Sequence, residues 1–163
     1  MTSLNFRLVV VLSVLTALWI ASPAAAGEQV PFKGSLAGNV IITPDTPPFV
    51  IVAIDASGSA SHLGGFTVSI PHRVNRDNRT AVGSYLFTAA NGDTLTADFT
   101  GLSAPTATPG VLLIVEHATI TGGTGRFENA SGQFVCERLF DTIAGETTGS
   151  FAGEITSPGA GKH

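Results

Sequence analysis

Apolar and polar residues alternate along two neighbouring segments of the chain, Val82–Ala90 and Thr94–Gly101. A period of two is typical of β-strands that bury one face and expose the other. The dipeptide Asn91-Gly92 lies between the two segments, and it favours the tight turn of a β-hairpin. The buried row of this predicted hairpin consists of Tyr85, Phe87, Ala89, Leu95, Ala97 and Phe99.

The rest of the chain predicts further strands and no helix, because glycine, threonine and valine recur without a sustained helical period. About eight strands are expected, the other six being Phe32–Ile42, Phe49–Asp55, Phe66–Val74, Val111–Ile120, Gln133–Asp141 and Thr148–Ile155. Segments 43–48 and 103–110 contain several prolines and are predicted to be loops. The sequence therefore predicts an all-β fold, a single antiparallel barrel of about eight strands, with a two-sheet sandwich as the alternative.

The first 26 residues have the three parts of a cleaved secretory signal peptide. Arg7 supplies a positive charge, residues 8–20 are apolar, and Ala24-Ala25-Ala26 offers small residues for cleavage. An uncleaved membrane anchor is the alternative, but the apolar run is shorter than the about 20 residues that span a bilayer. We expect a signal peptide at 1–26, a barrel domain at 27–156 and a flexible tail at 157–163. The mature protein is expected to be secreted or periplasmic and to have no membrane anchor.

Charge and cysteine content argue against several kinds of partner and site. Without the signal peptide, seven Lys and Arg stand against twelve Asp and Glu, a formal charge of −5. This charge disfavours nucleic acid or an anionic membrane as the main partner. Cys136 is the single cysteine, so no intramolecular disulfide can form. A small buried apolar residue is expected there, rather than a reactive thiol or a dimer bridge.

No sequence motif indicates catalysis or a bound metal. The four histidines are not spaced as metal ligands, and no Gly-x-Ser-x-Gly nucleophile motif is present. We therefore expect no metal, no cofactor and no catalytic residue. His72, Arg73, Arg76 and Arg79 form a cationic cluster, predicted to be a solvated loop between strands. A patch for an anionic ligand or a polysaccharide is the alternative.

A single charged residue interrupts each of two otherwise apolar rows. The first row is Leu112, Ile114, Glu116, Ala118 and Ile120, and the second is Phe134, Cys136, Arg138 and Phe140. If the two consecutive strands pair with Ile120 near Phe134, Glu116 lies opposite Arg138. Because an isolated buried charge is costly, these two residues are predicted to form an ion pair inside the barrel. The pair is either structural or a site that orients a bound ligand.

A glycine-rich corner, Thr121–Gly132, lies between those two strands. Gly122, Gly123 and Gly125 allow sharp turns, and at least one of Gly123 and Gly125 is expected to have a positive φ. Arg126 and Phe127 complete the turn, and Phe127 is expected to plug the end of the barrel. A phosphate cradle is the alternative, but no P-loop lysine follows the glycines.

The corner motif Gly122–Phe127, followed by Ala130-Ser131-Gly132, resembles that of the small barrels typified by allene oxide cyclases and plant dirigent proteins. It is still more similar to small secreted bacterial proteins that share this corner. A weaker likeness extends to Ser61–Thr67, Ala89–Leu95 and Thr148–Gly153. The resemblance implies the barrel fold and, often, association into oligomers. The catalytic pattern of the cyclases and the pocket pattern of dirigent proteins are not reproduced, so no catalytic residue is carried over.

Three functions remain open at the level of sequence. The first is a non-catalytic barrel that binds a small apolar or amphipathic molecule. The second is a cyclase-like or stereo-guiding protein of the same barrel type, and the third is a structural or adhesion module with a packed interior. The volume of the interior separates the third function from the first two, because only those need an open cavity. Convergent acids with a perturbed pKa in that cavity would favour an enzyme over a binding barrel.

The signal-peptide pattern makes a prediction about the exported protein. N-terminal sequencing of the mature form should begin at Gly27, because cleavage is expected after Ala26. Recovery of Met1 in the exported protein would contradict this.

Overall fold

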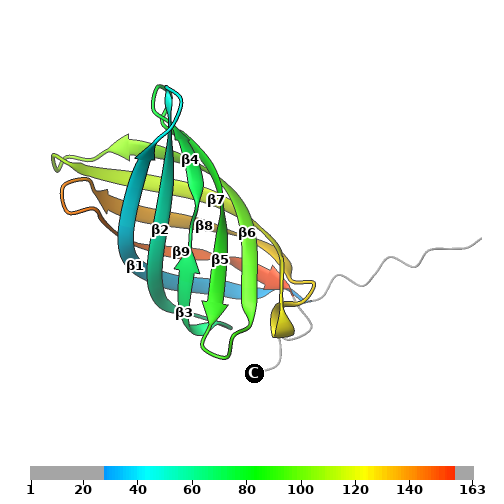
Figure 1. Ribbon diagram of the computed structural model, residues 1–163. Coiled ribbons are helices and arrows are strands. Elements are labelled where there is room, and N and C mark those ends of the chain that lie inside the picture. Colours follow the sequence, from blue (N-terminus) through cyan, green and yellow to red (C-terminus); the bar gives the residue numbers. More distant parts are fainter. Residues whose placement is uncertain (1–27, 157–163) are drawn as a thin grey trace, which may run out of the picture.

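Nine β-strand segments form one closed antiparallel sheet in the computed structural model, which describes residues 28–156 (Figure 1). The segments are β1 (Val30–Pro44), β2 (Phe49–Ala60), β3 (Gly64–Ser69), β4 (His72–Asn75), β5 (Thr80–Ala89), β6 (Thr94–Pro105), β7 (Val111–Gly123), β8 (Ser131–Asp141) and β9 (Glu146–Thr156), with a 3₁₀ turn, η1 (Gly125–Phe127), after β7. The sheet closes because β1 pairs with both β2 and β9. The predicted signal peptide and tail lie outside the described residues.

Segments β3 and β4 occupy one position in the barrel, so the prediction of eight strands is confirmed. Both pair with β2 and with β5, and the register does not change between them: Ser69 pairs with Asp55, and His72 pairs with Val52. The predicted single strand Phe66–Val74 is divided at Pro71, which has no N–H to donate to the sheet. Its residues nevertheless continue to alternate between the interior and the outside.

Most strands run further than the sequence predicted, β2 and β6 by the largest margin at one end. Strand β2 was expected to end at Asp55 but continues to Ala60, and β6 extends through Pro105 into the predicted loop 103–110. The added part of β2 places only small residues in the interior, so no large apolar side chain marked it as a strand. These segments are ordered by their neighbours, because residues 56–60 pair with β1 and 103–105 pair with β7.

Aromatic side chains fill one half of the barrel interior. Neighbouring ring centroids lie 5.0–6.4 Å apart, mostly in tilted or edge-to-face arrangements that aromatic pairs prefer. The exception is Tyr85, which stacks on Phe87 with an interplanar angle of 5°. The rings are Phe32, Phe66, Tyr85, Phe87, Phe99, Phe134 and Phe151. This half of the barrel is a packed core.

The glycine corner seals the packed half of the barrel. Turn η1 lies at the same end as the β5–β6 turn (Figure 1), and its Phe127 is fully buried in the core. Gly122 and Gly125 have φ of 134° and 58°, so the expectation of a positive φ at the corner is confirmed at Gly125. Gly123 has no positive φ but lies so close to the Thr94 carbonyl that it has no room for a Cβ.

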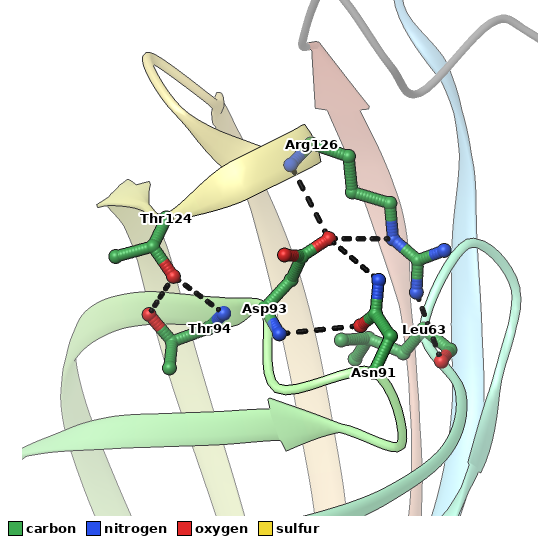
Figure 2. A network of polar contacts seen from close by, with 6 residues as sticks. All are labelled: Leu63, Asn91, Asp93, Thr94, Thr124 and Arg126. Carbon is green, nitrogen blue, oxygen red and sulfur yellow. Dashed lines mark hydrogen bonds and ion pairs between the residues drawn. The ribbon is translucent and has the colours of Figure 1, made fainter.

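Asp93, in the turn after β5, holds this corner in place (Figure 2). Its Oδ2 accepts hydrogen bonds from the Asn91 amide at 2.9 Å and from the Arg126 backbone N–H at 3.3 Å. The Arg126 guanidinium approaches the same oxygen at 3.8 Å and donates through Nη2 to the Leu63 carbonyl at 3.3 Å. Three of the four segments that carry the family resemblance thus meet at this end of the barrel.

A substitution at Gly125 tests the corner. An alanine there would take an unfavourable positive φ, and its Cβ would collide with the Asp93 carboxylate. Gly125→Ala should lower the free energy of unfolding, measured in urea, by about 1 kcal/mol or more. Gly65→Ala is the matched control, because its φ is not positive and no atom lies within 4 Å of the added Cβ. Its effect should stay within about 0.5 kcal/mol, and an equal loss in both variants would refute the account of the corner.

Candidate functional site

The other half of the barrel contains an open cavity of about 300 Å³. Its walls are mainly Val, Ile and Leu side chains, provided by the ends of strands that point away from η1, such as Ile42, Val50, Val74 and Leu112. Glu116, Arg138 and His72 also line it, and they lie next to the aromatic core. The barrel is therefore packed at one end and hollow at the other, with ionisable groups between the two halves.

Backbone hydrogen bonds connect the loops around the mouth of the cavity. Arg76 N donates to Pro48 O at 3.0 Å, and Ser103 N donates to Arg79 O at 3.1 Å. On the other side, Thr142 N donates to Gly110 O at 2.9 Å. Each of these bonds joins segments that are distant in the sequence, so the mouth is a preformed opening.

Glu116 and Arg138 form the predicted ion pair inside the barrel. Their side chains are 0 % and 2 % exposed, and Arg138 donates through Nε to Glu116 Oε2 at 3.1 Å and through Nη2 to Glu116 Oε1. The pairing of β7 with β8 differs from the prediction by two residues, so that Glu116 stands opposite Cys136, not Arg138. A shift of two keeps every side chain on its face of the sheet, and the long arginine reaches the carboxylate diagonally.

Two hydroxyl groups complete the hydrogen bonding of the pair. The Tyr85 hydroxyl donates to Glu116 Oε2, and Arg138 Nη1 donates to Thr147 Oγ1 at 3.1 Å. Thr147 in turn donates to the Leu139 carbonyl at 2.9 Å. Both carboxylate oxygens and all three guanidinium nitrogens therefore have partners, which is what a buried ion pair requires.

Burial and the carboxylate shift the pKa values of the neighbouring groups. Burial raises the pKa of the Tyr85 hydroxyl well above its ordinary value, and Glu116 raises it further. The Cys136 thiol, also buried beside Glu116, has a pKa raised to about 11. Burial disfavours the charged form of Arg138, but the attraction of Glu116 outweighs it and raises the pKa. At neutral pH, Tyr85 and Cys136 are thus uncharged, and Cys136 is not a reactive thiol.

His72 adds an uncharged polar group to the cavity. Its Nδ1 donates to the Ile70 carbonyl at 3.0 Å, which leaves the lone pair on Nε2 in the neutral ring. Burial lowers the pKa of His72, and this effect outweighs the bond to Ile70 and the attraction of Glu116, which raise it. His72 is therefore uncharged, unlike the three arginines with which the sequence analysis grouped it.

A glycine stands directly across the sheet from each of the three ionisable residues. Gly101 pairs with Glu116, Gly149 with Arg138 and Gly83 with His72. A Cβ on Gly149 or Gly83 would collide with the side chain opposite, and one on Gly101 would lie 3.0 Å from Glu116 Cγ. These glycines make room for large polar side chains in the barrel wall.

The residues of the cationic cluster predicted from the sequence do not lie together on one face of the barrel. Arg73 points away from the cavity, pairs with Asp45 at 2.8 Å and lies over the Phe49 ring at 3.7 Å. Arg76 and Arg79, in the turn after β4, line the mouth of the cavity. The alternating pattern of the strand explains the separation, because it sends His72 and Arg73 to opposite faces of the sheet.

Sequence reasoning found the ion pair but not the residues around it. Tyr85 was assigned to the apolar row of a hairpin, and Thr147 was not considered. Tyr85 could have been predicted to bond a buried polar group, because a buried tyrosine hydroxyl needs a hydrogen-bond partner. It is the only tyrosine in the chain. Within residues 28–156 there is no group of three or more His, Cys, Asp and Glu that could hold a metal ion. In the same range no helix has the length and apolarity needed to span a membrane.

Comparison with solved structures places the fold among dirigent-like closed β-barrels. The pterocarpan synthase dirigent protein GePTS1 is similar with a TM-score of 0.59 and 15 % identity, covering 86 % of this chain and 99 % of that protein. The pterocarpan synthase dirigent protein PsPTS1 is similar with a TM-score of 0.61 and 11 % identity, over 80 % and 96 % of the two chains. No family model and no curated protein matches the sequence. At these identities the likeness shows the fold alone, and the resemblance to allene oxide cyclases stays a prediction.

A double-mutant cycle tests whether the buried charges depend on each other. The cycle is measured in a Tyr85→Phe background, because the Tyr85 hydroxyl would otherwise lose its acceptor when Glu116 is replaced. In that background, Glu116→Leu and Arg138→Met should each lower the free energy of unfolding by about 3–5 kcal/mol. The double variant should cost less than either single one, because no unpaired charge then remains in the barrel. A coupling energy near zero would show that the two charges do not stabilise each other.

Proposed function

We propose that this protein is a non-catalytic barrel that binds one small amphipathic molecule in the open half of its interior. The observation that carries the proposal is the preformed cavity of about 300 Å³, apolar on its walls and polar at its base. Ligand pockets in proteins usually combine an apolar lining with a few fixed polar groups. A cavity of this volume is at the lower end of the usual range, so the ligand is small.

The hydrogen bonding at the base supports binding over catalysis. Glu116 and Arg138 neutralise each other, and Tyr85 and Thr147 complete their hydrogen bonds. A general acid or base needs a group free to exchange a proton with the substrate. Among the described residues at the base, only the Nε2 of His72 fits that description, and it can equally accept a hydrogen bond from a ligand hydroxyl. The open cavity likewise favours a binding barrel over a structural module, whose interior would be packed throughout.

A stereo-guiding protein is the second candidate, and the dirigent-like fold favours it. Both similar structures are named as pterocarpan synthase dirigent proteins. In this case the cavity would hold a reactive molecule in one orientation while a bond forms. The measurement that separates the two functions is the enantiomeric excess of a product formed in the presence of the protein.

A variant that fills the cavity tests ligand binding. The neutral fluorescent probe N-phenyl-1-naphthylamine should bind the wild-type protein with saturation. Ile114→Trp places an indole in the cavity and should weaken binding at least tenfold. The matched control is Leu113→Trp on the adjacent residue, which is 37 % exposed on the outer face and should leave binding unchanged. Thermal melting would verify that both variants fold, and binding that survives Ile114→Trp would show that the probe does not occupy the cavity.

A further inference from the structure

We propose that the cavity selects anionic amphipathic molecules, whose acidic group pairs with Arg76 and Arg79 at the mouth while the apolar body lies against the walls. This inference rests on the proposed binding function and specifies the chemistry of the ligand. It assigns a role in specificity to two residues that take no part in the buried polar cluster.

The two arginines have fixed positions at the mouth. Both line the cavity, and their backbones belong to the hydrogen bonds that connect the mouth loops, through Arg76 N and Arg79 O. The turn between them is ordered by side chains, since Asn75 Oδ1 accepts from Asp77 N at 3.0 Å and Asn78 Oδ1 accepts from Thr80 N at 3.1 Å. The backbone of each arginine is therefore held at the opening, and both exposed side chains line the cavity.

The described acids around the mouth form no ion pair with these arginines. Asp45 pairs with Arg73, and Asp141 Oδ1 accepts hydrogen bonds from two backbone N–H groups of the turn after β8. Asp77 lies beside Arg76 in sequence, but its carboxylate forms no ion pair with either arginine. Among residues 28–156, neither Arg76 nor Arg79 takes part in an ion pair. The mouth thus presents two guanidinium groups that form no ion pair with any described residue, on a chain whose formal charge is −4.

The base of the cavity is a poor place for the acidic group. Arg138 carries the positive charge there, but its Nε and Nη2 already donate to Glu116. A ligand anion at that position would face the Glu116 carboxylate and would also lose its hydration. At the mouth, by contrast, the anion remains partly hydrated beside two guanidinium groups that form no ion pair within the described part of the chain. The ligand is therefore oriented with its acidic group outward and its apolar part inward.

The expected selectivity is modest because the arginines are exposed. Exposed ion pairs are individually weak and are screened by salt. Two such contacts should together favour an anion over a neutral molecule of the same shape by about five- to tenfold at low ionic strength. Added salt should reduce this preference.

Two probes with the same aromatic frame provide the test. The probe 1-anilinonaphthalene-8-sulfonate carries one sulfonate, whereas N-phenyl-1-naphthylamine is its neutral counterpart. The wild-type protein should bind the sulfonate about five- to tenfold more tightly, and the double variant R76Q/R79Q should lose this preference while it retains the neutral probe. The double variant R73Q/D45N is the matched control, because it removes a cation of the same segment that points away from the cavity together with its carboxylate partner, and the preference should persist.

The outcomes separate this inference from the proposed function. Equal affinity for the two probes, or a preference that survives R76Q/R79Q, would overturn the inference that the cavity selects anions. Neither result would contradict the proposed binding function. Sulfonate binding that survives Ile114→Trp would also overturn it, because the anion would then lie outside the cavity. Failure of both probes to bind a folded wild-type protein would overturn the proposed function itself, and the inference with it.

Discussion

Two charges buried inside an apolar barrel impose the constraint on which the interior depends. Glu116 and Arg138 are tolerable there only because each neutralises the other and every polar atom finds a partner. Tyr85 supplies one of those partners through its hydroxyl, while its ring stacks on Phe87 in the aromatic core. The same residue thus belongs to the packed half and to the polar layer. Below this layer the barrel is solid, and above it the barrel is hollow.

The family resemblance and the candidate site lie at opposite ends of the molecule. The motif segments around Leu63, Asp93 and Arg126 meet at the sealed end, where a turn must pack under a glycine corner (Figure 2). The cavity is lined by residues outside those segments. This separation explains why the sequence indicates an architecture without indicating a chemistry. The residues that close a barrel are constrained by its geometry, whereas those at the open end are free to suit a ligand.

The alternation of apolar and polar residues predicted which side chains face the interior of the barrel. It did not predict which side chains contact each other, because those contacts depend on strand register and on the order of strands in the sheet. Alternation was enough to place Glu116 and Arg138 in the interior, and an error of two residues in the register did not change their faces. It could not show that Tyr85 would reach Glu116, because their strands pair with β6 on either side and are not neighbours. Nor could it show the extension of β2 to Ala60, since small residues in the interior carry no strong local signal and are ordered by pairing with β1.

The seam of the barrel has a consequence for how the chain acquires its structure. Strand β1 must pair with β9, so the sheet can close only when both residues 30–39 and residues 146–155 are present. Hairpins such as β5–β6 involve nearby residues and can form while the chain is incomplete, but the seam joins the two ends of the domain. A ribosome-bound chain that lacks β9 keeps two open sheet edges. The polypeptide therefore completes its fold only after synthesis of the domain has finished, and until then its unpaired edges need protection from aggregation.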